Sequence, residues 1–383
     1  MDYKKQVKLA GMSCAMKVKI ACVAILMMVG GAKVMMASTT LPIRGKVVKA
    51  SDERIQYIGR ISFADREAPA FNYPGTQIIA AFQGTSLRMI AKPESGYFMV
   101  QIDGAEPFKI NFCSPNDSVM SLATALPYGR HEVRLMYVME GYERRPEFRG
   151  FVLDEGCDLV APLPLPDRKI EFIGNSITCG YGNECMNQAE HFDYSTENHY
   201  YSYASMTARA LKAQHHATAR SGIGVYRNYN GPKTGNNDCM PTEYEYTMYQ
   251  DKSEKWDFKR FQPDVICVNL GTNDLSTKNY DIKLYRNAYL KFIQQVRGLN
   301  PKAKIVLLTG SMLNGKELEE ARKALDSVKS EFNKNGDGEV YRFDMSPQTG
   351  DLGYGADWHP SYWQHEKMAG ELTAYLRSLM GWF

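Results

Sequence analysis

The sequence predicts two folds in succession: an all-β sandwich of jelly-roll type, and then an α/β domain built on a parallel sheet. From about residue 41 to 165, short alternating apolar segments are separated by turn residues, a pattern typical of sandwiches. The proline-rich residues 161–166 then mark a boundary. From 168 to 383, apolar strand-like runs alternate with amphipathic segments, which indicates a parallel sheet with helices on both faces.

Strands of the first half are predicted by alternation of apolar and polar residues, and no segment there has the 3.6-residue spacing of a helix. The predicted strands are residues 86–90, 97–102, 107–112 and 131–137. Asp103-Gly104, between the second and third of these, is a dipeptide typical of tight hairpins.

The second half reads as strand and helix in turn. Residues 265–270 are almost continuously apolar, as expected of a strand buried on both faces. Residues 284–299 carry apolar side chains four apart, as expected of a helix that covers a sheet. His215 and His216 are predicted to close a helix. The other predicted strands are 170–173, 217–221, 305–308 and 340–343, and the other predicted helices are 200–211, 317–332 and 363–379.

Residues 1–37 have the composition of a secretory signal, with a possible true start at Met16. A basic segment precedes the ten apolar residues 20–29, and small residues follow. Ten residues span roughly 15 Å as a helix, about half of a bilayer core, so no stable membrane span is expected. We therefore expect a secreted or periplasmic protein.

Charge and cysteine content exclude two classes of function. The chain has 46 basic and 43 acidic residues; residues 1–37 hold six lysines and one aspartate, which leaves 40 basic and 42 acidic residues, a net charge of −2. This balance argues against nucleic-acid binding, which rests on phosphate neutralisation. No cysteine pair or histidine has ligand spacing, so neither a metal nor another cofactor is expected. In an oxidising compartment some cysteines could pair, and the connectivity stays open.

Four polar clusters follow predicted strands or lie near the carboxyl terminus. Because ligands of such sheets bind beyond the carboxyl ends of the strands, these clusters are expected to form the active site. Ser176 is the candidate nucleophile and His359 the candidate base. The backbone N–H groups of Ser176 and Gly222 and the side-chain amide of Asn273 are the candidate oxyanion donors.

These clusters resemble the blocks of the SGNH hydrolase superfamily, also called GDSL-like, which read G-D-S, G, G-x-N-D and D-x-x-H. Within it, residues 45–383 resemble carbohydrate esterase family 2, the two-domain acetyl esterases. The segments that carry the resemblance are 84–87, 102–104 and 151–154 in the first half, and 170–174, 178–184 and 226–229 in the second. The family implies a jelly-roll domain followed by a flavodoxin-like hydrolase domain that removes O-acetyl groups from plant polysaccharides.

The chain departs from the superfamily blocks at two positions. Asn175 stands where Asp usually precedes the serine, with a structural role expected. Ala356 stands three residues before His359, where the acid normally lies. Asp357, two residues before the histidine, is the candidate third member of the triad, because in an extended loop its side chain would share the side of the imidazole. The alternative is that a backbone carbonyl orients His359.

The expected substrate is an acetylated polysaccharide or oligosaccharide, such as xylan or glucomannan, with Trp358 offering a face for sugar stacking. Polar loop residues 226–241 favour a small acyl group over a long chain. The alternatives are an SGNH esterase or lipase for another short acyl ester, and a non-catalytic glycan-binding protein. The complete set of Ser176, Gly222, Asn273 and His359 argues against the last of these. The oligomeric state stays open.

Overall fold

The computed structural model describes residues 43–141 and 144–383, and Ile43–Phe383 form one compact unit. The predicted targeting segment, residues 1–37, lies outside the described residues. In the part of the chain that is described, no helix is both long and apolar enough to cross a membrane.

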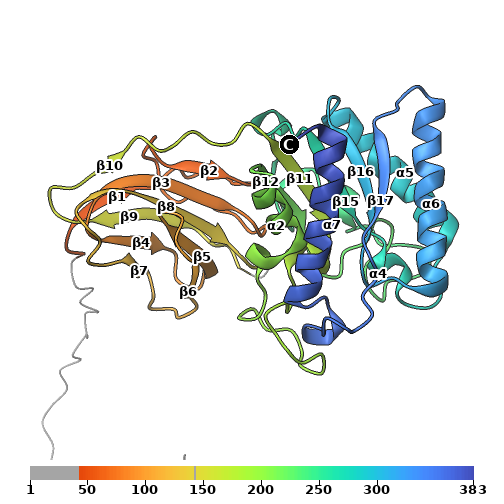
Figure 1. The fold of residues 1–383 in the computed structure, drawn as a ribbon, viewed down its shortest axis with the longest axis horizontal. Helices are drawn as coiled ribbons and strands as arrows, with labels where there is room; N and C mark the ends of the chain where they lie inside the picture. Colours follow the sequence, from red (N-terminus) through yellow and green to blue (C-terminus); the bar gives the residue numbers. More distant parts are fainter. Residues whose placement is uncertain (1–42, 142–143) are drawn as a thin grey trace, which may run out of the picture. The chain divides into compact units, whose positions relative to one another are not determined.

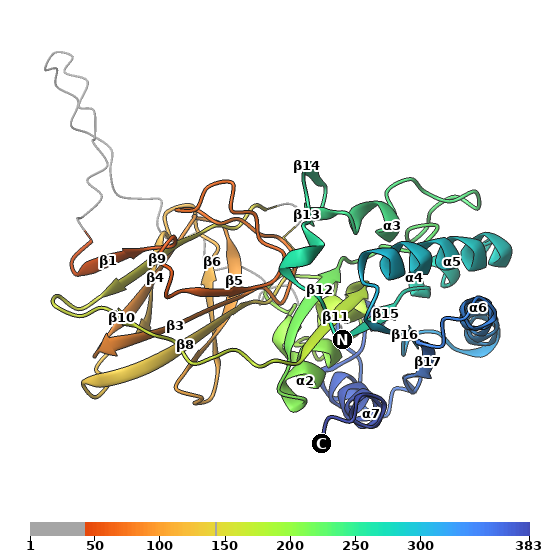
Figure 2. The ribbon, with the colours of Figure 1, turned by 90° about the horizontal axis from the view of Figure 1, so that it is seen from above.

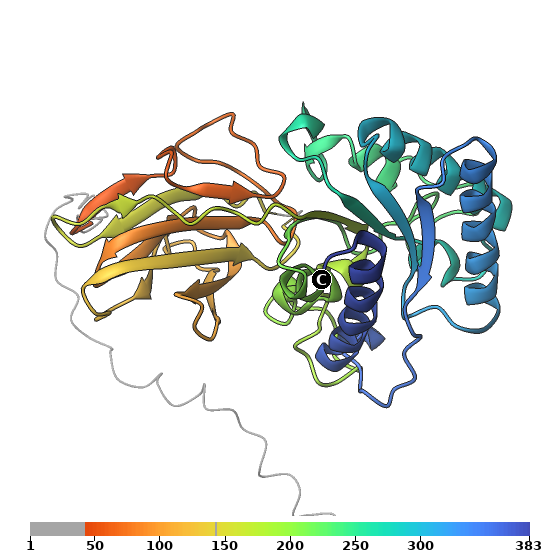
Figure 3. The same cartoon turned by 45° about the horizontal axis from the view of Figure 1, so that its top comes forward.

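The β-rich first part consists of two antiparallel sheets, drawn from red to yellow in Figures 1 and 3. One sheet has the strand order β1-β9-β4-β7, and the other β10-β3-β8-β5-β6 with β2 paired to β3. Alternate residues of both sheets, such as Met89 of β4 and Leu135 of β8, meet in one apolar core, which is the packing of a β-sandwich. The strands are β1 Lys46–Lys49, β2 Gln56–Ile58, β3 Gln77–Gly84, β4 Leu87–Ala91, β5 Gly96–Ile102, β6 Phe108–Phe112, β7 Val119–Ala123, β8 Gly129–Tyr137, β9 Phe148–Leu153 and β10 Leu159–Val160.

The Asp-Gly turn between β5 and β6 has the geometry that its residues favour. Asp103 and Gly104 have φ of 52° and 72°, both in the left-handed region, and the two strands pair antiparallel. The Asp103 carboxylate also accepts the N–H of Glu132 at 2.7 Å and contacts His131 Nδ1 at 2.6 Å. This carboxylate therefore ties the turn to β8.

The second part is a parallel sheet with the strand order β12-β11-β15-β16-β17. Its strands are β11 Lys169–Gly174, β12 Gln214–Ala219, β15 Val265–Asn269, β16 Lys304–Thr309 and β17 Val340–Asp344, and β13 Tyr246–Met248 with β14 Asp251–Lys255 forms a separate hairpin. The helices are α1 Ser176–Cys179, α2 Tyr203–Ala210, α3 Met240–Glu243, α4 Thr272–Leu275, α5 Ile282–Leu299, α6 Gly315–Lys334 and α7 Tyr362–Met380, with 3₁₀ turns at His199–Tyr201, Phe258–Arg260 and Ala356–Trp358.

Helices cover both faces of this sheet, as predicted (Figure 2). Ile266 and Val268 of β15 pack in one core with α5 and α6, whereas Val265 and Cys267 pack in another with α2 and α7. Side chains along a strand alternate between faces, so β15 is buried throughout and reads as a continuous apolar run. The second part therefore has the doubly covered parallel sheet that the sequence predicts.

Two predicted boundaries are wrong. The strand expected at 217–221 is β12, Gln214–Ala219, and His215 and His216 lie within it rather than at the end of a helix. The two histidines are buried, and the sequence pattern did not distinguish a short polar strand from a helix end. The helix expected from residue 200 begins at Tyr203, because the Ser202 side chain accepts the N–H of Ser205 and caps it.

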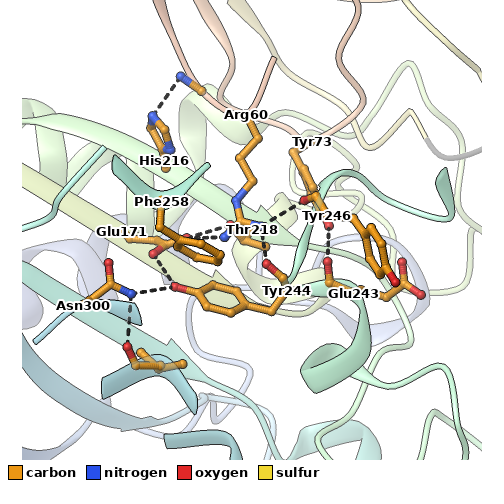
Figure 4. Close-up of polar contacts among 12 residues, drawn as sticks. Arg60, Tyr73, Glu171, His216, Thr218, Glu243, Tyr244, Tyr246, Phe258 and Asn300 are labelled. Atoms are coloured by element: carbon orange, nitrogen blue, oxygen red, sulfur yellow. Dashed lines mark hydrogen bonds and ion pairs between the residues drawn. The ribbon is translucent and has the colours of Figure 1, made fainter. Parts of the chain in front are cut away.

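A buried arginine joins the two parts of the described chain (Figure 4). Arg60 follows β2, and its guanidinium donates to the carbonyls of Tyr244 and Tyr246 at 2.5 and 3.0 Å and to Glu171 Oε1 of β11 at 3.1 Å. The same Glu171 carboxylate accepts the hydroxyls of Thr218 and Tyr244 at 2.9 and 2.8 Å. Both charged groups of this pair are almost fully buried, with side-chain exposures of 1% and 4%. We call this pair the Arg60–Glu171 clip.

Candidate active site

Ser176 opens helix α1 immediately after strand β11, at the carboxyl edge of the parallel sheet. Asn175 is the N-cap of this helix, and its side-chain oxygen accepts the N–H of Ile177 at 3.1 Å. An Asn cap satisfies a helix N–H group as an Asp cap does, so the geometry agrees with a structural role for this residue.

His359 reaches Ser176 from the loop after β17. Its Nε2 lies 2.9 Å from Ser176 Oγ, and its Nδ1 lies 3.2 Å from the carbonyl oxygen of Ala356. A carbonyl can only accept, so Nδ1 carries the proton and Nε2 has a free lone pair toward the serine hydroxyl. Burial lowers the pKa of His359 to about 4, which leaves the imidazole neutral at pH 7. The geometry suits a base that removes the Ser176 proton.

Asp357 does not occupy the position expected of a triad acid. Its carboxylate accepts the hydroxyl of Tyr181 at 2.7 Å and the N–H of Phe192 at 3.0 Å, and it contacts His191 Nδ1 at 2.8 Å. Among the described residues, the hydrogen-bond partner of His359 Nδ1 is the Ala356 carbonyl instead. The premise of an extended loop is wrong: Asp357 has φ of 47° and lies in a 3₁₀ turn, so an alternation of two does not apply.

Tyr181 links Asp357 to the histidine. Its ring stacks on the His359 imidazole with centroids 3.9 Å apart. The ring of Phe192 also stacks on that of Tyr181, with centroids 4.4 Å apart. Since the Tyr181 hydroxyl donates to Asp357, the carboxylate orients the ring that packs against the base. No role was predicted for Tyr181 from the sequence, although it lies in the 178–184 segment that carries the family resemblance.

The three candidate oxyanion donors lie around one cavity with Ser176 and His359. Gly222 follows β12 with φ of 75°, and in the described residues no protein acceptor takes its N–H or that of Ser176. The Asn273 amide nitrogen donates one hydrogen to the Ile223 carbonyl at 2.8 Å, which leaves its second hydrogen for a ligand. These groups come from the ends of β11, β12 and β15, where a parallel sheet gathers its ligand-binding residues.

The cavity has a volume of about 580 Å³, enough for a small acyl group and part of a sugar. Its lining residues are Ser176, Tyr181, Ser221, Gly222, Tyr229, Thr272, Asn273, Ser276, Met312, Asp357 and His359. Trp358, expected to border the pocket, is outside this lining; it is 56% exposed, and its ring lies 5.2 Å from that of Tyr354. Tyr229 is the exposed aromatic residue that does line the cavity.

Asp274 binds the backbone of the loop that follows Gly222. It is fully buried, and its carboxylate accepts the backbone N–H groups of Val225, Tyr226 and Arg227 at 2.9–3.1 Å. Burial raises the pKa of this carboxyl to about 6 against the opposing effect of those N–H bonds. The Arg227 guanidinium donates back to the Asp274 carbonyl at 2.8 Å. From the sequence, a role was predicted for Asn273 but none for Asp274.

One buried group in the described residues has the donors for a metal ion: Glu140, Cys179 and Glu197, with ligand atoms within 4.8 Å of one another. We call this group the Glu140 cluster. One oxygen of each carboxylate is engaged, since Glu140 Oε2 accepts the N–H of Ser221 at 2.6 Å and Glu197 Oε2 that of Glu140 at 3.0 Å. The buried Glu197 Oε1 has no hydrogen-bond partner among the described residues. These residues lie far apart in the chain, so ligand spacing could not indicate them. The six cysteines of the described residues are unpaired.

Comparison with known proteins assigns the family. Residues 57–164 match the family model "Carbohydrate esterase 2 N-terminal", and residues 172–367 match the "GDSL-like Lipase/Acylhydrolase family". The structure superposes with a TM-score of 0.80 on a family two carbohydrate esterase from Clostridium thermocellum, solved in complex with cellohexaose, at 36% identity over 86% of this chain and all of that one. The chain belongs to carbohydrate esterase family 2. Its members are carboxylic ester hydrolases.

Other relatives agree with this assignment. The family 2 esterase from Cellvibrio japonicus has a TM-score of 0.80 at 29% identity, over 88% of this chain and 98% of that one. An acetylxylan esterase / glucomannan deacetylase of the same organism is 31% identical over 88% of this chain and 91% of its own length. Cellulase/esterase CelE of Acetivibrio thermocellus is 38% identical over 86% of this chain, but the chain spans only 40% of that protein.

Proposed function

We propose that this family 2 esterase removes O-acetyl groups from plant cell-wall polysaccharides, such as acetylated xylan or glucomannan, or from oligosaccharides derived from them. The observation that carries the proposal is the 2.9 Å contact between Ser176 Oγ and His359 Nε2 in a cavity that Gly222 and Asn273 also line. The relatives named as acetylxylan esterase and glucomannan deacetylase support the acetyl group and the glycan.

The proposed reaction uses this chain's own residues in two halves. Ser176 Oγ attacks the acetyl carbonyl as His359 Nε2 takes its proton, and the oxyanion accepts hydrogen bonds from the N–H groups of Ser176 and Gly222 and from the Asn273 amide. Collapse of this intermediate breaks the ester bond, and His359 returns the proton to the departing sugar hydroxyl. A water molecule, deprotonated by His359, then attacks the acetyl-serine and releases acetate and free Ser176.

In this scheme the third member is the backbone. The Ala356 carbonyl accepts the Nδ1 proton of His359 and fixes its tautomer. Asp357 acts on His359 indirectly, through its hydrogen bond with Tyr181. The pair Ser176–His359 is thus a dyad with a carbonyl orienter rather than a Ser-His-Asp triad. We assign the glycan beyond the acetyl group to exposed aromatic rings, Tyr229 at the cavity and Trp358 outside its lining, since such faces stack on sugars.

The proposal extends to organisation and location. We assign residues 41–165 to the jelly-roll domain and 168–383 to the catalytic domain. The segment 1–37 directs export, which would bring the enzyme to a polymer too large to enter a cell. Among the described residues, no helix has the length and apolar character needed to span a membrane.

Hydrolysis of chromogenic acetyl, butyrate and octanoate esters by the wild type and Ser176→Ala tests the proposal. Acetate should be released fastest, and the alanine variant should lose roughly 10⁶ in turnover, the scale for a triad nucleophile in a serine hydrolase. A faster octanoate rate would favour a lipase, and no hydrolysis by the folded wild type would favour glycan binding without catalysis. Retention of activity in the variant would exclude the serine mechanism.

A further inference from the structure

Glu140 touches both backbone segments that supply oxyanion donors. It lies three residues beyond the end of β8 and is 2% exposed. Its Oε2 accepts the N–H of Ser221 at 2.6 Å, and the same oxygen lies 3.8 Å from Cys179 Sγ. Ser221 directly precedes Gly222, and Cys179 is the last residue of the helix that Ser176 begins. One carboxylate oxygen therefore contacts the backbone N–H of the residue before Gly222 and the thiol of Cys179, three residues after Ser176.

Hydrogen bonds at several positions hold the Ser221–Gly222 loop. The Arg220 N–H donates to the Gly174 carbonyl at 3.3 Å, and the Gly222 and Ile223 carbonyls accept the Tyr229 N–H and the Asn273 amide, each at 2.8 Å. Glu140 accepts the N–H of Ser221, one residue before the Gly222 N–H. An oxyanion donor must lie about 2.7–3.1 Å from the oxyanion, a window of only about 0.4 Å, so a small rotation of this peptide matters. Without an acceptor, the Ser221 N–H would be unpaired and the loop would move to find one.

Glu140 is itself fixed in position. Its backbone N–H donates to Glu197 Oε2 at 3.0 Å, and the nearby Val138 carbonyl accepts the N–H of His199 at 2.8 Å. Burial raises the pKa of both Glu140 and Glu197. Protonation does not remove the contact with Ser221, because a carboxylic acid keeps a carbonyl oxygen as acceptor. What the site requires of Glu140 is therefore an acceptor oxygen within hydrogen-bond distance of the Ser221 N–H.

We infer that Glu140 is a positioning residue for the oxyanion hole, one that holds the Ser221–Gly222 peptide against helix α1 so that the N–H groups of Gly222 and Ser176 converge. The inference rests on the proposed esterase function. Because Glu140 belongs to the chain that leaves β8, the β-sandwich part contributes directly to the geometry of the reaction.

Two substitutions separate the position of the Glu140 acceptor oxygen from the charge of its carboxylate. Glu140→Gln keeps an oxygen at the same distance and removes the charge, whereas Glu140→Asp keeps the charge and withdraws the oxygen by about 1.5 Å, one C–C bond. The control is Asn72→Ala, which removes another buried contact between the two parts, two bonds of 2.9 Å to the Tyr249 backbone, outside the cavity lining. Turnover and KM on an aryl acetate, inhibition by a boronic acid that forms a tetrahedral serine adduct, and Tm are measured for all.

Glu140→Asp should lower turnover by about 10- to 100-fold, part of the 10²–10³ for losing a whole donor, with KM within about 2-fold. The boronic acid should bind more weakly by a similar factor, and Glu140→Gln should stay within about 3-fold of wild type on both measures. Asn72→Ala should lower Tm and leave turnover unchanged.

Three results would overturn the inference. The first is equal turnover in Glu140→Asp and wild type, and the second is a loss of turnover in Glu140→Gln with turnover retained in Glu140→Asp. The third is boronic-acid binding that does not change with turnover. Loss of turnover in step with Tm, matched by Asn72→Ala, would assign Glu140 to stability alone. If the wild type hydrolyses no ester, the proposed function fails instead, which is a different outcome from an active wild type with an unaffected Asp variant.

Discussion

Replacing Asp357 should reduce turnover far less than removing a triad acid does. The carboxylate accepts from Tyr181 and Phe192, while the Ala356 carbonyl takes the Nδ1 proton of His359. The third contact, to His191, contributes little, because that side chain is 92% exposed. Asp357→Asn and Asp357→Ala therefore leave the tautomer of His359 intact and disturb only the stacking of Tyr181 on its ring.

The magnitude follows from one hydrogen bond. A single intramolecular bond contributes about 0.5–1.5 kcal/mol, and 1.36 kcal/mol corresponds to a tenfold change in rate, so a loss of roughly 2- to 12-fold is expected. Loss of an acid that is the sole orienter costs about 10⁴ in turnover. The two hypotheses thus differ by about three orders of magnitude, which ordinary steady-state kinetics resolves.

Turnover on an aryl acetate decides between them, with His359→Ala as the floor. Tyr181→Phe removes the same bond from its other end, so it should match Asp357→Asn, and the double variant should be no worse than either single one. A loss above about 30-fold in both Asp357 variants would refute the carbonyl-oriented dyad and restore the triad.

Four further outcomes are expected. Asn273→Ala should lower turnover by about 10²–10³ with little change in KM; an effect on KM alone would assign the amide to ground-state binding. Because burial lowers the pKa of His359 to about 4 and only the neutral imidazole accepts a proton, kcat/KM should stay level as pH falls to about 5 and drop below that, so an acid midpoint at 6.5 would contradict this environment. Arg60→Met should lower the free energy of unfolding by about 3–5 kcal/mol in urea titration, since Glu171 stays buried without its partner; a change under about 1 kcal/mol would show that water reaches the pair. Chelation should not alter turnover, and recovery of a lost rate by zinc would make the Glu140 cluster a metal site.

The fold class followed from patterns that local physics controls. The alternation along β4 shows that one face of this strand is buried, and the apolar run of β15 shows that both of its faces are buried. The strand β12 was predicted but not its polar start, because His215 and His216 are buried through tertiary contacts that the local sequence does not encode.

The candidate site divides in the same way. Ser176, Gly222 and Asn273 could be placed because each follows a strand, and the ends of parallel strands meet. The role of Asp357 could not be read, since it depends on a left-handed backbone conformation inside a loop. Glu140 was beyond sequence reasoning altogether: its contact with Ser221 joins residues 81 positions apart.

The Arg60–Glu171 clip has a consequence for the order in which the chain matures. Arg60 lies 184 and 186 residues ahead of the two carbonyls that accept its guanidinium. While the chain is synthesised from its amino terminus, the sandwich strands emerge with this cation still in water. A chain stopped after β10 would keep an arginine that has no burial site, and its strands could pair without completing their native surroundings. The sandwich is therefore the first part made, and Arg60 reaches its buried partners only after Tyr246 of β13 has been translated.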